Sequence, residues 1–261
     1  MSLITFNYCC TICNATYDIR PDYTVCPRCA EDQQADQPLY GVLEVELNGT
    51  GREPFLISDL LPIEPEYFPP IPVGNTPLWE PDNLRALTGF KSLYIKDDGS
   101  NPTSSFKDRA SYLVSAAARK FKIEDITLAS TGNAGSSMAG IGAAGGQRVT
   151  LFLPRSAPPA KLVQALQYGA RVFRVNGNYD KAYDLSLAFS QEKGGINRNT
   201  AYNPLTIEGK KTVSLELFRQ LGRAPEVDFV SVGDGCILAG VYKGFKDLVR
   251  LGYIPAVPKV I

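Results

Sequence analysis

From about residue 91 onward, short apolar runs alternate with longer stretches whose apolar residues recur at helical spacing. The short runs predict strands, and they are Ser92–Lys96, Asp125–Ala129, Arg148–Leu153, Arg171–Val175, Asp228–Val232 and Pro258–Ile261. The stretches between them predict helices, and these are Phe106–Phe121, Asn133–Ala144, Pro159–Tyr168, Tyr179–Gln191, Glu208–Leu221 and Ile237–Leu251. Strand–helix alternation of this kind predicts an α/β fold with parallel sheets.

The N-terminal part of the chain follows a different pattern. Apolar and charged residues alternate over Val42–Leu47, which predicts a single strand. Prolines then recur, which predicts an extended connector rather than a packed element. They are Pro54, Pro62, Pro65, Pro69, Pro70, Pro72 and Pro77.

Five of the six cysteines precede this connector, and four of them have metal-ligand spacing. Cys10 and Cys13 form one C-x-x-C pair, and Cys26 and Cys29 form a second. Each pair presents two thiolates from one tight turn, so the two turns together predict a structural zinc ribbon. A metal-free or disulfide-bonded remnant of a ribbon is the alternative, and Cys9 competes with Cys10 as a ligand. Intact thiols favour a reducing compartment, so we expect a cytoplasmic protein.

Composition removes several functional classes. The sequence contains no histidine, which excludes Ser-His-Asp and Cys-His catalysis and any His-ligated metal site. Its formal net charge is zero, so nothing in the overall charge favours nucleic acid or an anionic membrane as a partner. No apolar run approaches the roughly 20 residues of a membrane span, and the N-terminus does not resemble a signal peptide.

Three loops follow predicted strands and run into predicted helices, where α/β proteins bind ligands. The first loop, at residues 97–109, places Lys107 in the first helical turn. The positive end of the helix dipole favours the neutral amine there, as Schiff-base chemistry requires. A solvated surface lysine, offset by Asp108, is the alternative.

The other two loops predict anion cradles. Ser130–Gly135 follows an apolar strand and exposes backbone N–H groups at the start of a helix. Val232–Ile237 repeats this arrangement with two glycines, but Leu238 stands where the dinucleotide fingerprint needs a third glycine. NAD is therefore not expected. Asp234 is an unfavourable neighbour for a phosphate unless its carboxylate points away.

Four segments, in this order and spacing, resemble the threonine synthase family of fold-type-II pyridoxal 5′-phosphate (PLP) enzymes. They are the G-N-T-P-L run Gly74–Leu78, the PLP-lysine motif Asn101–Arg109, the carboxylate loop Ser130–Ala134 and the N-P-x-x-x-E-G-x-K-T segment Asn203–Thr212. A cysteine ribbon ahead of this core also occurs in the threonine synthase branch. The resemblance spans residues 10 to 261.

The resemblance implies PLP as cofactor and assigns roles. Lys107 would hold PLP through a Schiff base and shuttle protons, and Asn133 would bond to the ring oxygen. The cofactor phosphate would lie on the third loop, at Gly233, Asp234, Gly235, Cys236 and Ile237. The substrate would meet a second set of residues, namely Ser130, Thr131, Gly132, Asn133, Ala134, Thr206 and Lys211.

The resemblance also implies a domain organisation: a zinc-ribbon-like module (1–47), a proline-rich connector (48–72), a large PLP domain (73–109 and 203–261) and a small α/β domain (110–202). Compared with the family, we expect the chain to lack a C-terminal part, including the Ser or Thr that faces the pyridine nitrogen. The oligomeric state stays open, with a homodimer as one alternative.

The activity implied is conversion of O-phospho-L-homoserine and water to L-threonine and phosphate. Many threonine synthases carry Arg where this chain has Thr206, and a neutral side chain cannot clamp a phosphate. Lys210 and Lys211 are candidates to replace that arginine, with a solvated lysine as the alternative for each. This departure favours the alternative of another PLP-dependent β-elimination or replacement enzyme, such as a serine/threonine dehydratase or a phosphoserine-using synthase. A non-catalytic ribbon protein with a relic PLP domain is the alternative of another class.

Overall fold

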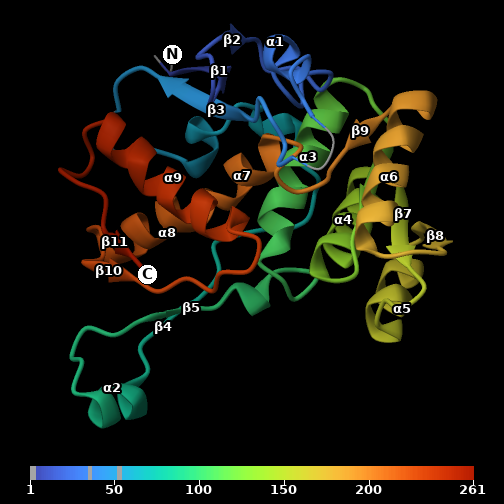
Figure 1. Ribbon diagram of the computed structural model, residues 1–261. Helices are drawn as coiled ribbons and strands as arrows, with labels where there is room; N and C mark the ends of the chain where they lie inside the picture. Colours follow the sequence, from blue (N-terminus) through green and yellow to red (C-terminus); the bar gives the residue numbers. More distant parts are fainter. Residues whose placement is uncertain (1–3, 35–36, 52–54) are drawn as a thin grey trace.

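The fold was analysed in a computed structural model, which describes residues 4–34, 37–51 and 55–261 (Figure 1). Elements near the N-terminus form an antiparallel sheet in the order β2-β1-β3, from β1 (Thr5–Cys10), β2 (Thr16–Tyr17) and β3 (Leu43–Asn48). A short helix, α1 (Pro27–Ala30), lies beside it. The strand expected at Val42–Leu47 is confirmed as β3, whose side chains alternate between buried and half-buried.

The connector is more ordered than its prolines predict. It contains two 3-10 turns, η1 (Ile57–Leu60) and η2 (Pro65–Tyr67). Leu60 and Ile63 are buried, so the connector packs against the body instead of crossing it as an extended chain. The sequence interpretation therefore underestimated the apolar residues between the prolines. Pro54 lies outside the described residues.

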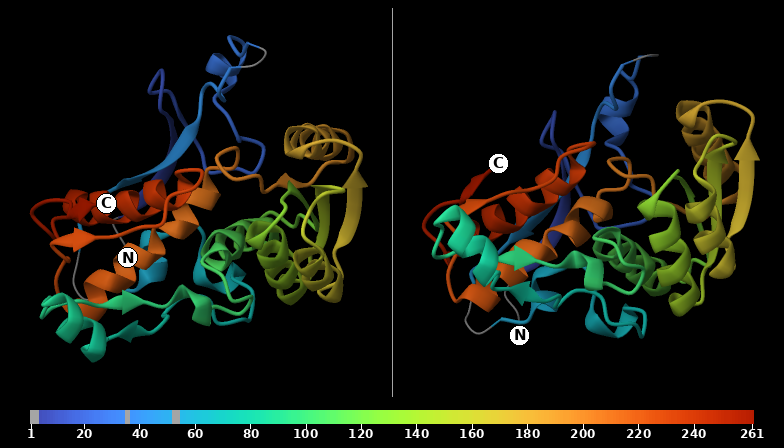
Figure 2. Two further views of the ribbon diagram at one scale, coloured as in Figure 1. Left: turned by 60° about the horizontal axis from the view of Figure 1, so that its bottom comes forward. Right: turned by 90° about the horizontal axis from the view of Figure 1, so that it is seen from below.

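An arm projects from the body, formed by β4 (Leu78–Trp79), α2 (Asp82–Thr88) and β5 (Ile95–Lys96) (Figures 1 and 2). The strand expected at Ser92–Lys96 does not join a parallel sheet, because β5 pairs antiparallel with β4. Trp79 stands at the base of this arm, where its Nε1 donates to Asp97 Oδ2 at 3.1 Å.

A four-stranded parallel sheet forms one side of the molecule, in the order β8-β7-β6-β9 (Figure 1). The strands are β6 (Asp125–Ala129), β7 (Arg148–Pro154), β8 (Arg171–Val175) and β9 (Ile196–Asn197). Helices α4 (Asn133–Gly145), α5 (Pro159–Gln167) and α6 (Tyr179–Lys193) connect them. The three longer strands were expected from their apolar residues. β6 and β7 are largely buried, as parallel strands inside a sheet require, whereas the edge strand β8 is mostly exposed.

Helix α3 (Lys107–Lys120) lies between this sheet layer and a C-terminal group of helices. That group consists of α7 (Leu205–Lys210), α8 (Thr212–Leu221) and α9 (Cys236–Arg250). The 3-10 turn η3 (Asp98–Ser100) precedes α3, and the pair β10 (Val227–Asp228) and β11 (Lys259–Val260) forms a short parallel sheet. The boundary expected between residues 109 and 110 falls inside α3, which contacts both α4 and α7.

The helix expected at Glu208–Leu221 is two helices, α7 and α8, which meet at Lys211. Within the described ranges, no helix combines the length and apolar character needed to cross a membrane.

Candidate active site

The loop before α3 holds Lys107 in a fixed place. The carboxylate of Asp108 is buried and accepts hydrogen bonds from both the backbone N–H and the hydroxyl of Thr103. The hydroxyl of Ser105 accepts the backbone N–H of Lys107 at 3.1 Å. Asp108 is thus engaged in shaping the loop and is not the exposed partner that the surface-lysine alternative requires.

The Gly74–Leu78 segment is tied to the same loop. Asn101 Oδ1 accepts the N–H of Gly74 at 2.9 Å, and Glu216 Oε1 accepts the N–H of Asn75 at 2.7 Å. Glu216 also pairs with Arg109 at 2.6 Å. Residues from two of the four segments that carry the resemblance therefore form one network with Glu216 around the start of α3.

The amine of Lys107 is half-buried and has no hydrogen-bond or ion-pair partner among the described residues. Burial lowers its pKa; Asp234 opposes this shift, and the positive charge of Arg198 adds to it. A larger share of neutral amine is available than for a lysine in water, as nucleophilic chemistry requires.

In the Ser130–Ala134 loop, the Ser130 hydroxyl accepts the N–H groups of Gly132 and Gly135, at 3.2 and 2.9 Å. Ser130 thus caps the start of α4 with its own side chain. The side chains of Thr131 and Asn133 have no hydrogen bond among the described residues, and Asn133 is exposed. The backbone N–H groups of Thr131 and Ala134 have no acceptor among the described residues, so they remain open to a ligand together with Asn133.

The Gly233–Ile237 loop forms the exposed start of α9. Gly235 has a φ of 78°, a left-handed conformation that suits glycine. Asp234 Oδ1 accepts the N–H of Cys236 at 3.0 Å, so the carboxylate is turned toward the helix start. An anion at this site would compete with that carboxylate for the helix N–H groups.

Two substrate residues expected from the sequence are engaged elsewhere. Thr206 is fully buried, and its hydroxyl donates to the backbone oxygen of Asn203 at 2.8 Å. Lys211 is also fully buried, and its amine pairs with Glu208 and with Asp247, the latter at 2.7 Å. Both side chains are engaged by other residues of the chain, so their role toward a substrate stays a prediction.

Two buried cations lie at the site. Arg198 was missed by the sequence analysis, whereas Lys210 was considered there only as a replacement for the arginine absent at Thr206. Both are completely buried, and both interact electrostatically with Asp234 and Cys236, as Lys107 does. There was a reason in the sequence to consider Lys210, because it stands directly before the lysine of the E-G-x-K-T segment. No sequence pattern pointed to Arg198, since it follows a strand of only two residues.

The four ribbon cysteines come together as their spacing predicts. The sulfur atoms of Cys10, Cys13, Cys26 and Cys29 all lie within 4.8 Å of one another. The Sγ distances are 3.8 Å for Cys10–Cys29 and 3.7 Å for Cys13–Cys26. A zinc ion with Zn–S bonds of about 2.3 Å separates its sulfur ligands by about 3.8 Å, so the group fits this metal. Cys9 is outside the group.

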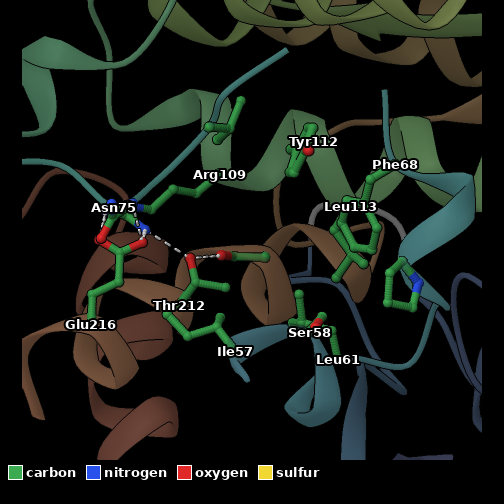
Figure 3. Close-up of a pocket in the computed structure, with 13 residues that line it drawn as sticks. Ile57, Ser58, Leu61, Phe68, Asn75, Arg109, Tyr112, Leu113, Thr212 and Glu216 are labelled. Atoms are coloured by element: carbon green, nitrogen blue, oxygen red, sulfur yellow. Dashed lines mark hydrogen bonds and ion pairs between the residues drawn. The ribbon is translucent and has the colours of Figure 1, made fainter. Parts of the chain in front are cut away.

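A cavity lies beside α3 (Figure 3). Its volume is about 270 Å³, and Arg109 and Tyr112 line it from α3. Figure 3 shows Arg109, Asn75, Thr212 and Glu216 gathered at one end and apolar side chains at the other. None of the residues expected to bind cofactor or substrate lines this cavity, so its size does not identify the active site.

Comparisons with known proteins agree with one another. The profile of a family described as "Pyridoxal-phosphate dependent enzyme" matches residues 71–261. The threonine synthase of Methanocaldococcus jannaschii is 38% identical, over 72% of this chain and 46% of the relative. That of Methanosarcina acetivorans is 33% identical, over 97% of this chain and 59% of the relative. The chain thus spans about half the length of the curated relatives it matches.

Solved structures share the fold at lower identity. Maize serine racemase matches 72% of this chain and 55% of its own, with a TM-score of 0.63 and 22% identity. The processed form of threonine deaminase isoform 2 from Solanum lycopersicum matches 71% of this chain and 49% of its own, with a TM-score of 0.61 and 24% identity.

Proposed function

The chain belongs to the pyridoxal-phosphate dependent enzyme family, and from that premise we propose that it is a lyase of the threonine synthase type. It would convert O-phospho-L-homoserine and water to L-threonine and phosphate. The observation that carries the proposal is the unpartnered, half-buried amine of Lys107 within the segments that resemble this family. Relatives named threonine synthase, at 33–40% identity, support the choice of reaction.

The residues around Lys107 fit pyridoxal phosphate. A free amine with a lowered pKa faces buried cations and a helix start with exposed backbone donors. Lys107 would hold the cofactor covalently, Asn133 would bond to its ring, and the Gly233–Ile237 loop would take its phosphate. This last role requires Asp234 to release the N–H of Cys236.

When bound, the cofactor supplies an electron sink that stabilises negative charge on the substrate carbons. The chain itself positions the substrate and moves protons. The free N–H groups of the Ser130–Ala134 loop would bind the substrate carboxylate. Because burial lowers the pKa of Lys107, its Nζ can accept a proton from a substrate carbon and return it.

A second reaction remains a candidate because of Thr206. Its hydroxyl is committed to Asn203, so it offers a substrate phosphate neither a charge nor a free donor. Another PLP-dependent β-elimination or replacement reaction, on serine, threonine or phosphoserine, would not need an arginine at this position. Comparing O-phospho-L-homoserine, O-phospho-L-serine and L-threonine as substrates separates the two candidates.

We also propose that Cys10, Cys13, Cys26 and Cys29 hold a structural zinc ion. Support comes from the sulfur separations and from the N–H of Ile12, which donates to Cys10 Sγ at 3.4 Å. Thiolates available to a metal favour a reducing compartment, such as the cytoplasm.

The test of the enzyme proposal is the visible absorbance of the purified chain with PLP. Wild type is expected to form a Schiff-base band, and borohydride is expected to trap PLP on Lys107. Lys107→Ala should do neither, whereas Lys91→Ala, which removes an exposed lysine of the arm, should behave as wild type. A trapped adduct that persists in Lys107→Ala would overturn the assignment of the lysine. Threonine formation from O-phospho-L-homoserine then tests the reaction.

A further inference from the structure

Two cationic side chains are enclosed in the protein and form no ion pair with any described residue. Arg198 and Lys210 are 1% and 0% exposed. The Nζ of Lys210 and the Nε of Arg198 have no hydrogen-bond partner among the described residues. Burying an unpaired charge is so unfavourable that such groups normally acquire a counter-ion or shift their pKa. Two of them at one place point to an anion that the chain itself does not supply.

The surrounding helices fix both side chains. Arg198 follows β9 and donates to Thr200 Oγ1 at 3.0 Å and to Ser111 Oγ, on α3, at 3.3 Å. Lys210 ends α7, and α9 crosses it so closely that a Cβ on Gly240 would lie 2.5 Å from the Cβ of Lys210. The lysine therefore has little freedom to turn its amine toward solvent.

The two cations belong to the site of Lys107. The positive charge of Arg198 acts on both lysines, and Lys107 acts on Lys210. The carboxylate of Asp234 is the acidic group that all three share, but it lies on the exposed loop before α9 and accepts the N–H of Cys236. Asp108 also acts on Arg198, but both of its oxygens already accept hydrogen bonds from Thr103. The cations at this place therefore outnumber the carboxylates.

We propose that Arg198 and Lys210 form a subsite for the phosphate of a phosphorylated amino-acid substrate beside Lys107. The proposal rests on the proposed function, in which the backbone N–H groups of the Gly233–Ile237 loop take the cofactor phosphate. The two cations are then left for a second phosphate, whose charge they match. Arg198 offers an unused N–H and Lys210 an ammonium, which are the donors that phosphate prefers.

Burial lowers the pKa of Lys210 to about 7, and the charge of Arg198 acts in the same direction. A bound phosphate dianion would favour the protonated amine and so bind to a lysine that becomes fully charged only in its presence. This behaviour would make the subsite selective for doubly charged groups over neutral ones.

The test is a spectral titration of the PLP-loaded chain with O-phospho-L-homoserine and with L-homoserine, which differ only in the phosphate. Wild type is expected to bind the phosphorylated compound more tightly. Lys210→Gln and Arg198→Gln should reduce that preference roughly 10- to 100-fold, the range for one charge-assisted hydrogen bond. Their affinity for L-homoserine should stay unchanged. Lys91→Gln, with the same loss of charge on the exposed arm, should leave the preference intact.

A preference unaffected by Lys210→Gln would overturn the proposal. So would a parallel loss of PLP affinity with no change in preference, because the cations would then hold the cofactor phosphate. Calorimetry with inorganic phosphate separates this proposal from the enzyme proposal. If no Schiff-base band forms, the PLP-free chain should still bind phosphate, and Lys210→Gln should weaken that binding. Equal binding by both would reject the subsite.

Discussion

A buried lysine without a counter-ion stabilises a protein only in its neutral form. Burial lowers the pKa of Lys210 from 10.5 to about 7. Between these two values the unfolded chain holds a proton that the folded chain releases. The free energy of unfolding therefore rises with pH across this window, by up to about 1.4 kcal/mol per pH unit. Asp234, Cys236, Arg198 and Lys107 face the same amine and modify this slope.

We predict that Lys210→Gln is more stable than wild type at pH 7 in phosphate-free buffer without cofactor. The advantage should shrink toward pH 10, because the wild-type amine becomes neutral there. Urea unfolding at several pH values measures this difference, and Lys91→Gln is the control. Parallel pH curves for wild type and Lys210→Gln would show that the lysine does not titrate in this range.

Glu216 presents the opposite case, a buried carboxylate with two cationic partners. Burial alone would raise its pKa, but Arg109 and Lys96 lower it to about 2. The stability it contributes is present above its ordinary pKa of 4.5 and is lost as the pH falls toward 2.

We predict that Glu216→Gln destabilises the chain by about 3–5 kcal/mol at pH 7, since Arg109 would keep only Asp98 as a charged partner. The variant should also lose less stability than wild type between pH 4.5 and pH 2. Denaturant melts at both ends of this range measure the effect. Glu192→Gln, which removes an exposed carboxylate paired with Lys193, should leave stability unchanged.

At the scale of residues, the sequence singles out Lys107 because a lysine at a helix start is chemically unusual, and its role stays a prediction. It could not place Thr206 and Lys211, because neighbouring positions on a helix point in different directions. Lys210 faces the site while Lys211 pairs with Asp247 on the far side of α7. Consecutive residues of a helix are rotated by 100°, so Lys210 and Lys211 project in different directions.

Among the elements, the contact between α3 and α7 needs a glycine. A Cβ on Gly209 would lie 2.9 Å from Ala110 Cα and even closer to the backbone oxygen of Arg109. The two helices can approach this closely only if position 209 has no Cβ, that is, if it is a glycine. The close packing of α7 against α3 is thus sufficient to explain why position 209 is a glycine.

We predict that Gly209→Ala destabilises the chain by about 1–3 kcal/mol, because the helices must separate to admit the methyl group. Chemical denaturation measures the loss. Gly233→Ala is the matched control, since a Cβ there meets no atom within 4 Å. A similar effect for both variants would mean that glycine flexibility, rather than the helix contact, sets the cost.

The strands β6 and β7 could be predicted because each is a largely buried run of at least five residues, and β8 because apolar residues recur in its five. Two-residue strands such as β4 and β9 are too short to show a period. The strand at Ile95–Lys96 was placed in the wrong sheet, because an apolar run does not reveal its partner. In the structure, β5 pairs antiparallel with β4 of the same arm.

Across the whole molecule, the ribbon and the α/β body share one hydrophobic core. Tyr8 and Val45 of the ribbon sheet are buried in the same cluster as Leu113 and Val114 of α3. Arg250 of α9 reaches back to Glu46 of β3 at 2.9 Å. Loss of order in the ribbon therefore exposes apolar surface of the body as well.

We predict that chelation of the proposed zinc ion lowers the melting temperature of the entire chain in a single transition. A loss of about 2–3 kcal/mol would correspond to a fall of roughly 5–10 °C. Differential scanning calorimetry with and without chelator measures the shift. Cys29→Ser should melt like the chelated protein, and Cys9→Ser like the untreated one, because Cys9 is outside the sulfur group. Two separate transitions would contradict a shared core.

The arm has one consequence for spectroscopy. Trp79 is the single tryptophan of the sequence, and it stands half-exposed at the base of the arm, two residues beyond Pro77 of the Gly74–Leu78 segment. Selective excitation of the indole therefore reports on one position, without a background from the core. Its emission should lie at the long wavelengths of a hydrated indole. Ligands that bind without moving the arm would leave this emission in place, whereas closure of the body against the arm would shift it to shorter wavelengths.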